Sequence, residues 1–237
     1  MSVDREPARS YRSCMPPLEA FGPSIAIGLI LFVMLWFALG TQRNIRIGND
    51  LLRWLQRGLP LLGRRTTLRW LGSSAVELRI VEPAEPFREA TVLAVLEPRD
   101  VSLLWAFARW RGRRDFLIVR ASLVRPPRFS MEVRDPRTWT GRADGHDQAT
   151  NGGGETGWHR LDWPGGCVAV AGPGADEAAI RSTWEALGAA SGGVWKLTVQ
   201  PVVPHLEVHV RPAGDRPVGA DALLTPIRQL AATLTQR

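Results

Sequence analysis

The chain has 237 residues, of which 45% are hydrophobic and 22% are charged, a balance that excludes an intrinsically disordered protein. Its formal net charge of +7 is concentrated in residues 43–142, which contain 20 basic and 10 acidic residues, whereas residues 143–237 contain 7 basic and 10 acidic residues. Two cysteines, Cys14 and Cys167, exclude a disulfide framework and a cysteine-based zinc site.

The stretch from Pro23 to Gly40 contains no charged residue. Its 18 residues would form a helix about 27 Å long, close to the thickness of the hydrocarbon core of a bilayer. Apolar side chains occur on every side of this helix, so it has no polar face to expose to water. The sequence therefore predicts a membrane anchor, whose defining residues include Ile25, Leu29, Phe32 and Trp36. The alternatives are a buried core helix and a cleaved signal peptide ending near Gly40, but the 22-residue polar segment before the run favours an uncleaved anchor.

Arginine counts on the two sides of the apolar run predict its orientation. Three arginines precede the run, and six follow it within residues 43–65. The positive-inside rule therefore places the N-terminus outside and the C-terminal domain in the cytoplasm. The basic charge of residues 43–142 suits anionic lipid head groups or RNA phosphates. A compositional bias is the alternative explanation, because 29 of the 30 basic residues are arginine.

Composition and periodicity divide the chain into six segments. We expect a polar N-terminal tail at 1–22, a transmembrane helix at 23–40, a juxtamembrane amphipathic helix at 41–63, a first α+β half at 64–135, a flexible Gly-rich loop at 136–157 and a second α+β half with a C-terminal helix at 158–237. Asn49 or Asp50 is placed to cap the juxtamembrane helix, and Pro60 to interrupt it.

The two halves follow similar patterns. In the first half we expect strands at 66–71, 75–81, 89–96, 116–124 and 129–133, with a helix from the N-cap Asp100 to Trp110 that Gly112 ends. In the second half we expect strands at 158–163, 167–171, 194–199 and 206–210, with a helix that begins after Asp176 and a final helix from about Asp221. The predicted fold class is therefore α+β: a single N-terminal transmembrane helix, then a soluble domain of two β-α-β-β-like halves that pair through their sheets, and a C-terminal helix.

Candidate chemistry is sparse. His205, Glu207 and His209 alternate along a predicted strand and so face one side, which is a spacing for three metal ligands. The solvated face of an antiparallel strand is the favoured interpretation, so we predict no metal site. The sequence also contains no phosphate-binding glycine motif and no recognisable nucleophile motif. We therefore expect no cofactor, no catalytic residue and no enzymatic activity.

A basic surface is the best sequence-level candidate for a functional site. Arginines interleave with Trp105 and Trp110 around the helix of the first half, a mixture typical of nucleic-acid or head-group contact. The predicted basic surface consists of Arg64, Arg65, Arg109, Arg111, Arg113 and Arg114.

Three stretches carry a resemblance to a known family. They are the uncharged helix followed by TQRN, the segment AVLEPRDVSLLWAFARWRGRRDFLIVRASL, and the segment CVAVAGPGADEAAIRSTWEALGAA with the final helix. Their order over residues 25–237 resembles calumin, the single-pass subunit of the endoplasmic-reticulum chaperone complex that assists insertion of multipass membrane proteins. The resemblance implies partners among the translocon, the ribosome and nascent membrane proteins, but the sequence departs from the family in lacking the basic helical extension that would reach a ribosome. Calcium binding is not carried over from that family, because the N-terminal tail of this chain lacks the family's long acidic region.

Taken together, these features predict a non-enzymatic single-pass membrane protein whose cytoplasmic domain binds macromolecules and assists membrane-protein insertion or biogenesis. The first alternative is a membrane-anchored basic module that binds anionic lipid or RNA, with binding that weakens steeply with salt. The second alternative is an enzyme with an unrecognised site, which a deep pocket with converging polar groups would favour.

Overall fold

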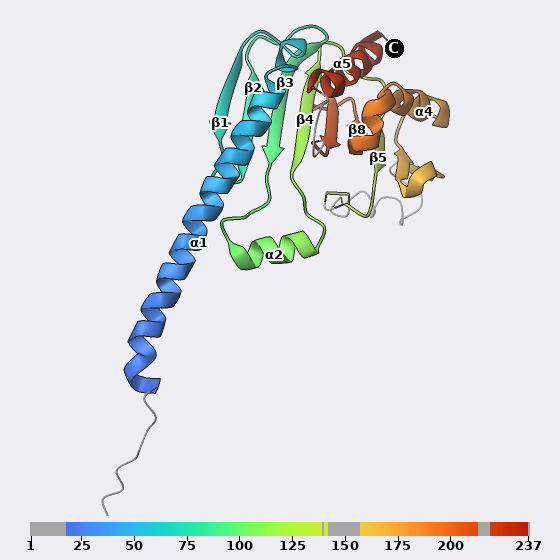
Figure 1. Ribbon diagram of the computed structural model, residues 1–237. Helices are drawn as coiled ribbons and strands as arrows, with labels where there is room; N and C mark the ends of the chain where they lie inside the picture. The colour runs from blue at the N-terminus through green and yellow to red at the C-terminus, as the bar shows by residue number, and fades with distance from the viewer. Residues whose placement is uncertain (1–17, 139, 142–156, 213–218, 237) are drawn as a thin grey trace, which may run out of the picture.

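The computed structural model describes residues 18–138, 140–141, 157–212 and 219–236. One long N-terminal helix leads into a domain built on a large antiparallel sheet, and a C-terminal helix packs on that sheet (Figure 1). This arrangement confirms the α+β class. The predicted tail at 1–22 and the Gly-rich loop at 136–157 lie mostly outside the described residues.

Helix α1, Leu18–Leu55, has 38 residues and two environments along its length. Residues 21–39 are exposed, and among the described residues this is the one helix long and apolar enough to cross a membrane. From Gly40 onward, a stripe with a spacing of three to four residues is buried against the domain. That stripe consists of Gly40, Asn44, Gly48, Leu51, Leu52 and Leu55.

The prediction of a separate juxtamembrane helix is wrong. Helix α1 continues without a break from the apolar run to Leu55, so Asn49 and Asp50 lie inside it and cap no helix. The continuous buried stripe explains the difference, because packing against the sheet favours one straight helix over two short ones. After a turn, the short 3₁₀ helix η1, Leu59–Leu61, contains Pro60 and leads into the first strand.

Nine strands form one sheet, and every pairing between neighbours is antiparallel. The strands are β1 Thr66–Trp70, β2 Ala75–Ile80, β3 Phe87–Val95, β4 Phe116–Leu123, β5 Met131–Arg134, β6 His159–Leu161, β7 Val168–Ala171, β8 Val194–Val199 and β9 Leu206–Val210. Their order across the sheet is β1-β2-β3-β4-β9-β8-β5-β7-β6.

This strand order does not confirm two separate β-α-β-β units. Strand β5 of the first half lies between β8 and β7 of the second half, and β9 of the second half lies beside β4. All four residues of β5 are buried, and the strand has a partner on each edge. A strand buried on both faces is stable only in the interior of a sheet, where its backbone groups are paired on both sides.

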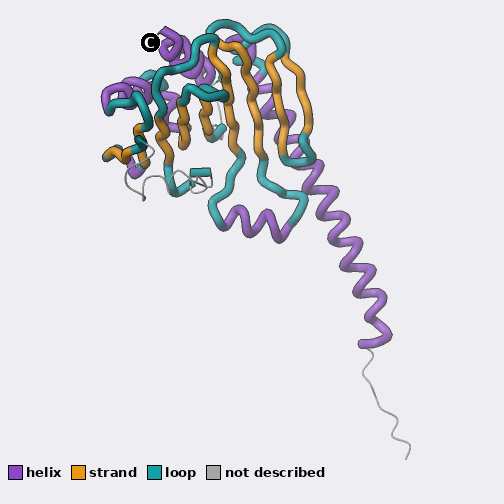
Figure 2. Tube along the Cα trace, turned by 180° about the vertical axis from the view of Figure 1, so that it is seen from behind, coloured by secondary structure: helices purple, strands orange, loops and turns teal. Residues whose placement is uncertain are grey.

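Helices cover one face of the sheet. The second part of α1, helix α4 (Glu177–Glu185) and helix α5 (Asp221–Gln236) lie on the same side, and Figure 2 shows the opposite face, where the described residues form no helix. The main core lies under these helices and contains alternate residues of the strands, such as Val92, Val119, Leu197 and Val208. The described residues also form the short 3₁₀ helices η2, Pro164–Gly166, and η3, Gly188–Gly193.

Helix α2, Ser102–Trp110, connects β3 to β4 beyond one end of the sheet, next to α1 (Figure 1). Gly112 follows the helix with a φ of 84°, which confirms the predicted stop. The predicted cap is wrong: Val101 is the N-cap residue, and the Asp100 carboxylate accepts a hydrogen bond from Ser73 in the loop between β1 and β2.

Candidate functional site at the α1–α2 junction

Helix α2 is held at the level where the apolar part of α1 ends. A Cβ atom at position 40 would overlap the carbonyl oxygen of Arg99 and lie 2.6 Å from the Cα atom of Asp100. Glycine at this position therefore allows the backbone of α1 to touch the linker that leads into α2. The contact places the start of α2 beside the end of the uncharged run, and Figure 1 shows α2 next to α1.

Six hydrogen-bonding residues join α1, α2 and the end of the sheet next to α2, and we name them the junction network. Asn44 of α1 donates a hydrogen bond from Nδ2 to the Glu97 carbonyl oxygen (3.1 Å) and accepts one at Oδ1 from Arg99 Nη1 (3.1 Å). The Glu97 amide donates to Asp115 Oδ1 at 2.7 Å. The junction network consists of Asn44, Glu97, Arg99, Trp105, Arg109 and Asp115.

The Glu97 side chain attaches α2 to the sheet. This carboxylate is 2% exposed and accepts a hydrogen bond from Trp105 Nε1 at 2.6 Å. Arg109, one turn further along α2, donates to its two oxygens at 3.2 and 3.3 Å. A buried carboxylate is stable only with such partners, so Glu97 fixes both the position and the rotation of α2.

Charges balance within the junction network. Arg99 forms a two-pronged pair with Asp115, with nitrogen–oxygen distances of 2.9 and 3.1 Å, and lies 3.7 Å from Glu97. Arg109 provides a second guanidinium group, so two positive charges balance the two carboxylates of Glu97 and Asp115. Because planar two-pronged pairs are geometrically strict, the network joins the three elements rigidly.

A small niche separates α1 from α2. Its volume is about 190 Å³, and its lining residues are Trp36, Leu39, Gly40, Arg43, Arg99 and Trp105. We name it the α1–α2 niche. Its lining therefore combines two tryptophans and a leucine with two arginines.

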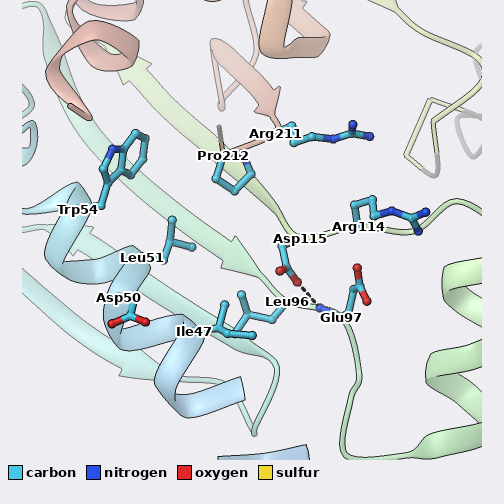
Figure 3. A pocket seen from close by; sticks show the side chains of 10 residues that line it. All are labelled: Ile47, Asp50, Leu51, Trp54, Leu96, Glu97, Arg114, Asp115, Arg211 and Pro212. Carbon is cyan, nitrogen blue, oxygen red and sulfur yellow. Dashed lines mark hydrogen bonds between the residues drawn. The ribbon is translucent and has the colours of Figure 1, made fainter. Parts of the chain in front are cut away.

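A larger cavity of about 390 Å³ lies between α1 and the lower end of the sheet (Figure 3). Its apolar wall consists of Ile47, Leu51, Trp54, Leu96 and Pro212. Figure 3 shows the carboxylates of Glu97 and Asp115 close together on one side, and Asp50 across from them on α1.

Each charged residue of this cavity has a contact within the chain. Asp50 pairs with Arg53 at 3.1 Å, and the two other carboxylates belong to the junction network. Arg211 lies over the Trp195 ring at 5.7 Å, and Arg114 donates to two backbone carbonyl oxygens. The residues that line the cavity include no serine, cysteine or histidine.

The predicted basic surface is divided into two parts. Arg64 and Arg65 precede β1, and the register pairs Thr66 with Ile80 and Ile80 with Ala90. Five further residues of β3, about 17 Å of extended chain, separate that level from the end of β3 that leads to α2. Arg64 and Arg65 therefore lie at the end of the sheet far from α2, and treating all six arginines as one surface was wrong. Arg65 pairs there with Glu82 at 3.4 Å.

The other four predicted arginines gather around the last turn of α2. Arg109 belongs to the junction network, and the Arg111 guanidinium lies 5.0 Å from the centre of the Phe107 ring. Arg114 donates to the carbonyl oxygens of Arg109 and Arg113 at 3.0 and 2.7 Å. Burial lowers the pKa of Arg113, and the carboxylates of the junction network oppose that shift.

His205, Glu207 and His209, which have the spacing of metal ligands, form hydrogen bonds within the chain. His205 Nδ1 accepts a hydrogen bond from the Leu123 amide at 2.9 Å, and burial lowers the pKa of this imidazole. Glu207 bonds His209 at 2.7 Å and Arg120 at 2.6 Å. Burial opposes ionisation of Glu207, but these partners together outweigh it and lower its pKa to about 2. Among the described residues, no three potential ligands converge on a metal position.

Comparison with protein-family models and with curated proteins finds no match for this chain. The resemblance to calumin therefore stays a prediction.

Proposed function

We propose that this chain is a non-enzymatic, single-pass membrane protein that binds hydrophobic segments of other membrane proteins and so assists their insertion or assembly. Helix α1 anchors it with the N-terminus outside, and the sheet domain lies in the cytoplasm against the membrane. The observation that carries the proposal is the α1–α2 niche, which lies beside the anchor where the uncharged run ends.

The size and position of the niche favour a protein segment as its occupant. At about 190 Å³ it is smaller than the cavities of roughly 300–1,000 Å³ that hold cofactors and drug-sized molecules. It accommodates one or two side chains of a passing helix. Since α1 is exposed up to Leu39, a second helix that packs along α1 reaches the niche without leaving the lipid.

The polar groups of the niche suit the end of a transmembrane helix. Arg43, which is exposed, lines the niche together with Trp36 and Trp105, whereas the Arg99 guanidinium is engaged with Asp115. The last carbonyl groups of a helix lack intrahelical partners and carry partial negative charge, so cations stabilise them. The niche therefore offers apolar contact to the last turn of a client helix and charge to its carbonyl end.

The same proposal fits the partners implied by the family resemblance, which are the translocon, the ribosome and nascent membrane proteins. The RNA alternative is less favoured, because the predicted arginines form two separate groups. The enzyme alternative is less favoured, because the charged groups of the larger cavity are engaged within the chain.

Site-specific photocrosslinking in native membranes tests this function. A photoreactive amino acid replaces Trp36, which lines the niche from α1 and is not part of the junction network, in the full-length chain while a multispanning membrane protein is synthesised. The matched control places the same probe at Val202, an exposed apolar residue in the loop between β8 and β9. We expect crosslinks to the new protein from position 36 and none from position 202. Crosslinks to lipid alone from position 36 would contradict the proposal and favour the lipid-binding alternative.

A further inference from the structure

Helix α2 exposes a row of large apolar side chains. Leu103 is 84% exposed and Trp110 is 81% exposed, and about half of the surface of Leu104 and Phe107 is also exposed. Single exposed apolar residues are common on soluble proteins, but four on a nine-residue helix form a contiguous patch. Such a patch marks a surface that contacts something other than water.

The patch points away from the sheet. Trp105 bonds Glu97, and Ala108 is 2% exposed, so this side of α2 faces the domain. Residues 103, 107 and 110 follow one another at spacings of four and three and therefore share the opposite side of the helix. The junction network prevents α2 from turning this side inward, because Glu97 fixes the helix at two points along its length.

The position of α2 relative to α1 indicates what covers the patch. The linker to α2 touches α1 at Gly40, where the uncharged run ends. Figure 1 shows α2 lying across the end of the sheet, on the side from which the exposed part of α1 extends. A bilayer that surrounds residues 23–40 therefore has its interface at the level of α2.

Positive charge surrounds the patch. Arg111 lies over the Phe107 ring at 5.0 Å, Arg114 lies just beyond the helix, and Arg43 lies on the facing part of α1. Basic side chains beside leucine, phenylalanine and tryptophan are typical of helices that lie in the membrane interface, where guanidinium groups meet lipid phosphates.

We infer that α2 is an interfacial helix that inserts its apolar side into the leaflet beside α1, with anionic phospholipid as its occupant. The domain then contacts the membrane at two points, and the strands stand away from its surface. This inference rests on the proposed placement of α1 in the membrane and adds a second contact that the anchor alone does not require.

Depth-dependent quenching in vesicles tests the inference. The full-length chain, with serine in place of Cys14 and Cys167, is reconstituted into vesicles of phosphatidylcholine and phosphatidylglycerol. An NBD label is attached to one introduced cysteine, Ala106→Cys on the exposed side of α2, and nitroxide-labelled lipids act as quenchers. Leu31→Cys labels the anchor. Val202→Cys labels an apolar, 71% exposed position at the far end of the sheet, since Leu206 pairs with Ala121 and Ala121 with Ala90.

At positions 31 and 106 we expect the NBD emission to shift to the blue and to be quenched by the nitroxide-labelled lipids. At position 202 we expect neither the shift nor the quenching. Leu103→Asp combined with Trp110→Asp is expected to abolish the quenching at 106 while that at 31 remains, whereas Val202→Asp leaves both unchanged. Quenching at 31 without quenching at 106 would overturn the inference and leave the anchor intact. The absence of quenching at both positions would overturn the inference together with the proposed function.

Discussion

Replacing Glu97 by glutamine tests the junction network most sharply. The substitution keeps the shape of the side chain but removes the charge that Trp105 and Arg109 contact at 2.6 and 3.2 Å. Breaking a fully buried charge pair costs about 3–5 kcal/mol. Because Arg109 is half exposed and regains water when released, we expect a smaller loss of roughly 2–3 kcal/mol in the free energy of unfolding.

The matched control is Glu82→Gln, which removes a carboxylate that pairs with Arg65 at 3.4 Å in an exposed site. Exposed pairs contribute at most about 1 kcal/mol. Thermal unfolding of the full-length chain in detergent micelles is followed by circular dichroism, and hydrogen exchange reports on the amides of α2. We expect Tm to fall by roughly 5–10 °C for Glu97→Gln, with faster exchange in α2, and by no more than about 3 °C for Glu82→Gln. Equal effects of the two substitutions would refute the structural role of the network.

Three further substitutions address other parts of the molecule. Gly40→Leu is expected to separate α1 from the α2 linker and accelerate hydrogen exchange in α2, whereas Gly28→Leu, where a Cβ meets no atom within 4 Å, is expected to change nothing. Ile227→Ala removes a fully buried side chain of α5 and is expected to cost about 2–5 kcal/mol in chemical denaturation. The folded-state pKa of about 2 for Glu207 lies below its ordinary value of 4.5, so its ionised form stabilises the fold above about pH 5, and this contribution is lost as the pH falls towards 2. Glu207→Gln is therefore expected to remove on the order of 1–2 kcal/mol at neutral pH, after allowance for solvent screening, and to flatten the acid limb of the stability curve. An acid limb identical to that of the unmodified chain would contradict this assignment.

Local patterns predicted the elements well where the sequence itself decides the conformation. The predicted ranges of β8 and β9 match their bounds, and the predicted start of α5 at Asp221 is that of the structure. The helix predicted to begin after Asp176 is α4, and Asp176 caps it by accepting a hydrogen bond from the Ala179 amide at 2.6 Å. In each case the signal lies within a few residues of the chain.

Features that depend on distant contacts were missed. The position of β5 between β8 and β7 depends on pairings that alternation does not specify. The periodicity of α2 predicted a helix but not that Trp105 and Ala108, rather than Leu103 and Phe107, face the domain. That orientation depends on Glu97, whose partners cannot be identified without the fold.

The sequence did contain a signal for the junction network. Acidic and basic residues alternate at the two ends of the α2 connection, with Glu97 and Arg99 before the helix and Arg109 and Asp115 in its last turn and beyond it. The connection through α2 joins two adjacent strands, so its two ends lie side by side at the sheet. Opposite charges at these two ends can therefore pair. The sequence interpretation treated the arginines as a solvent-facing surface and so overlooked their partners.

Alkaline extraction combined with protease treatment tests the central claim, which is that α1 anchors the domain to the cytoplasmic face of a membrane. The account predicts that the full-length chain stays in the membrane pellet at high pH and that protease added outside intact cells leaves the sheet domain whole. Release of the chain into the supernatant, or digestion of the domain from outside, would contradict it.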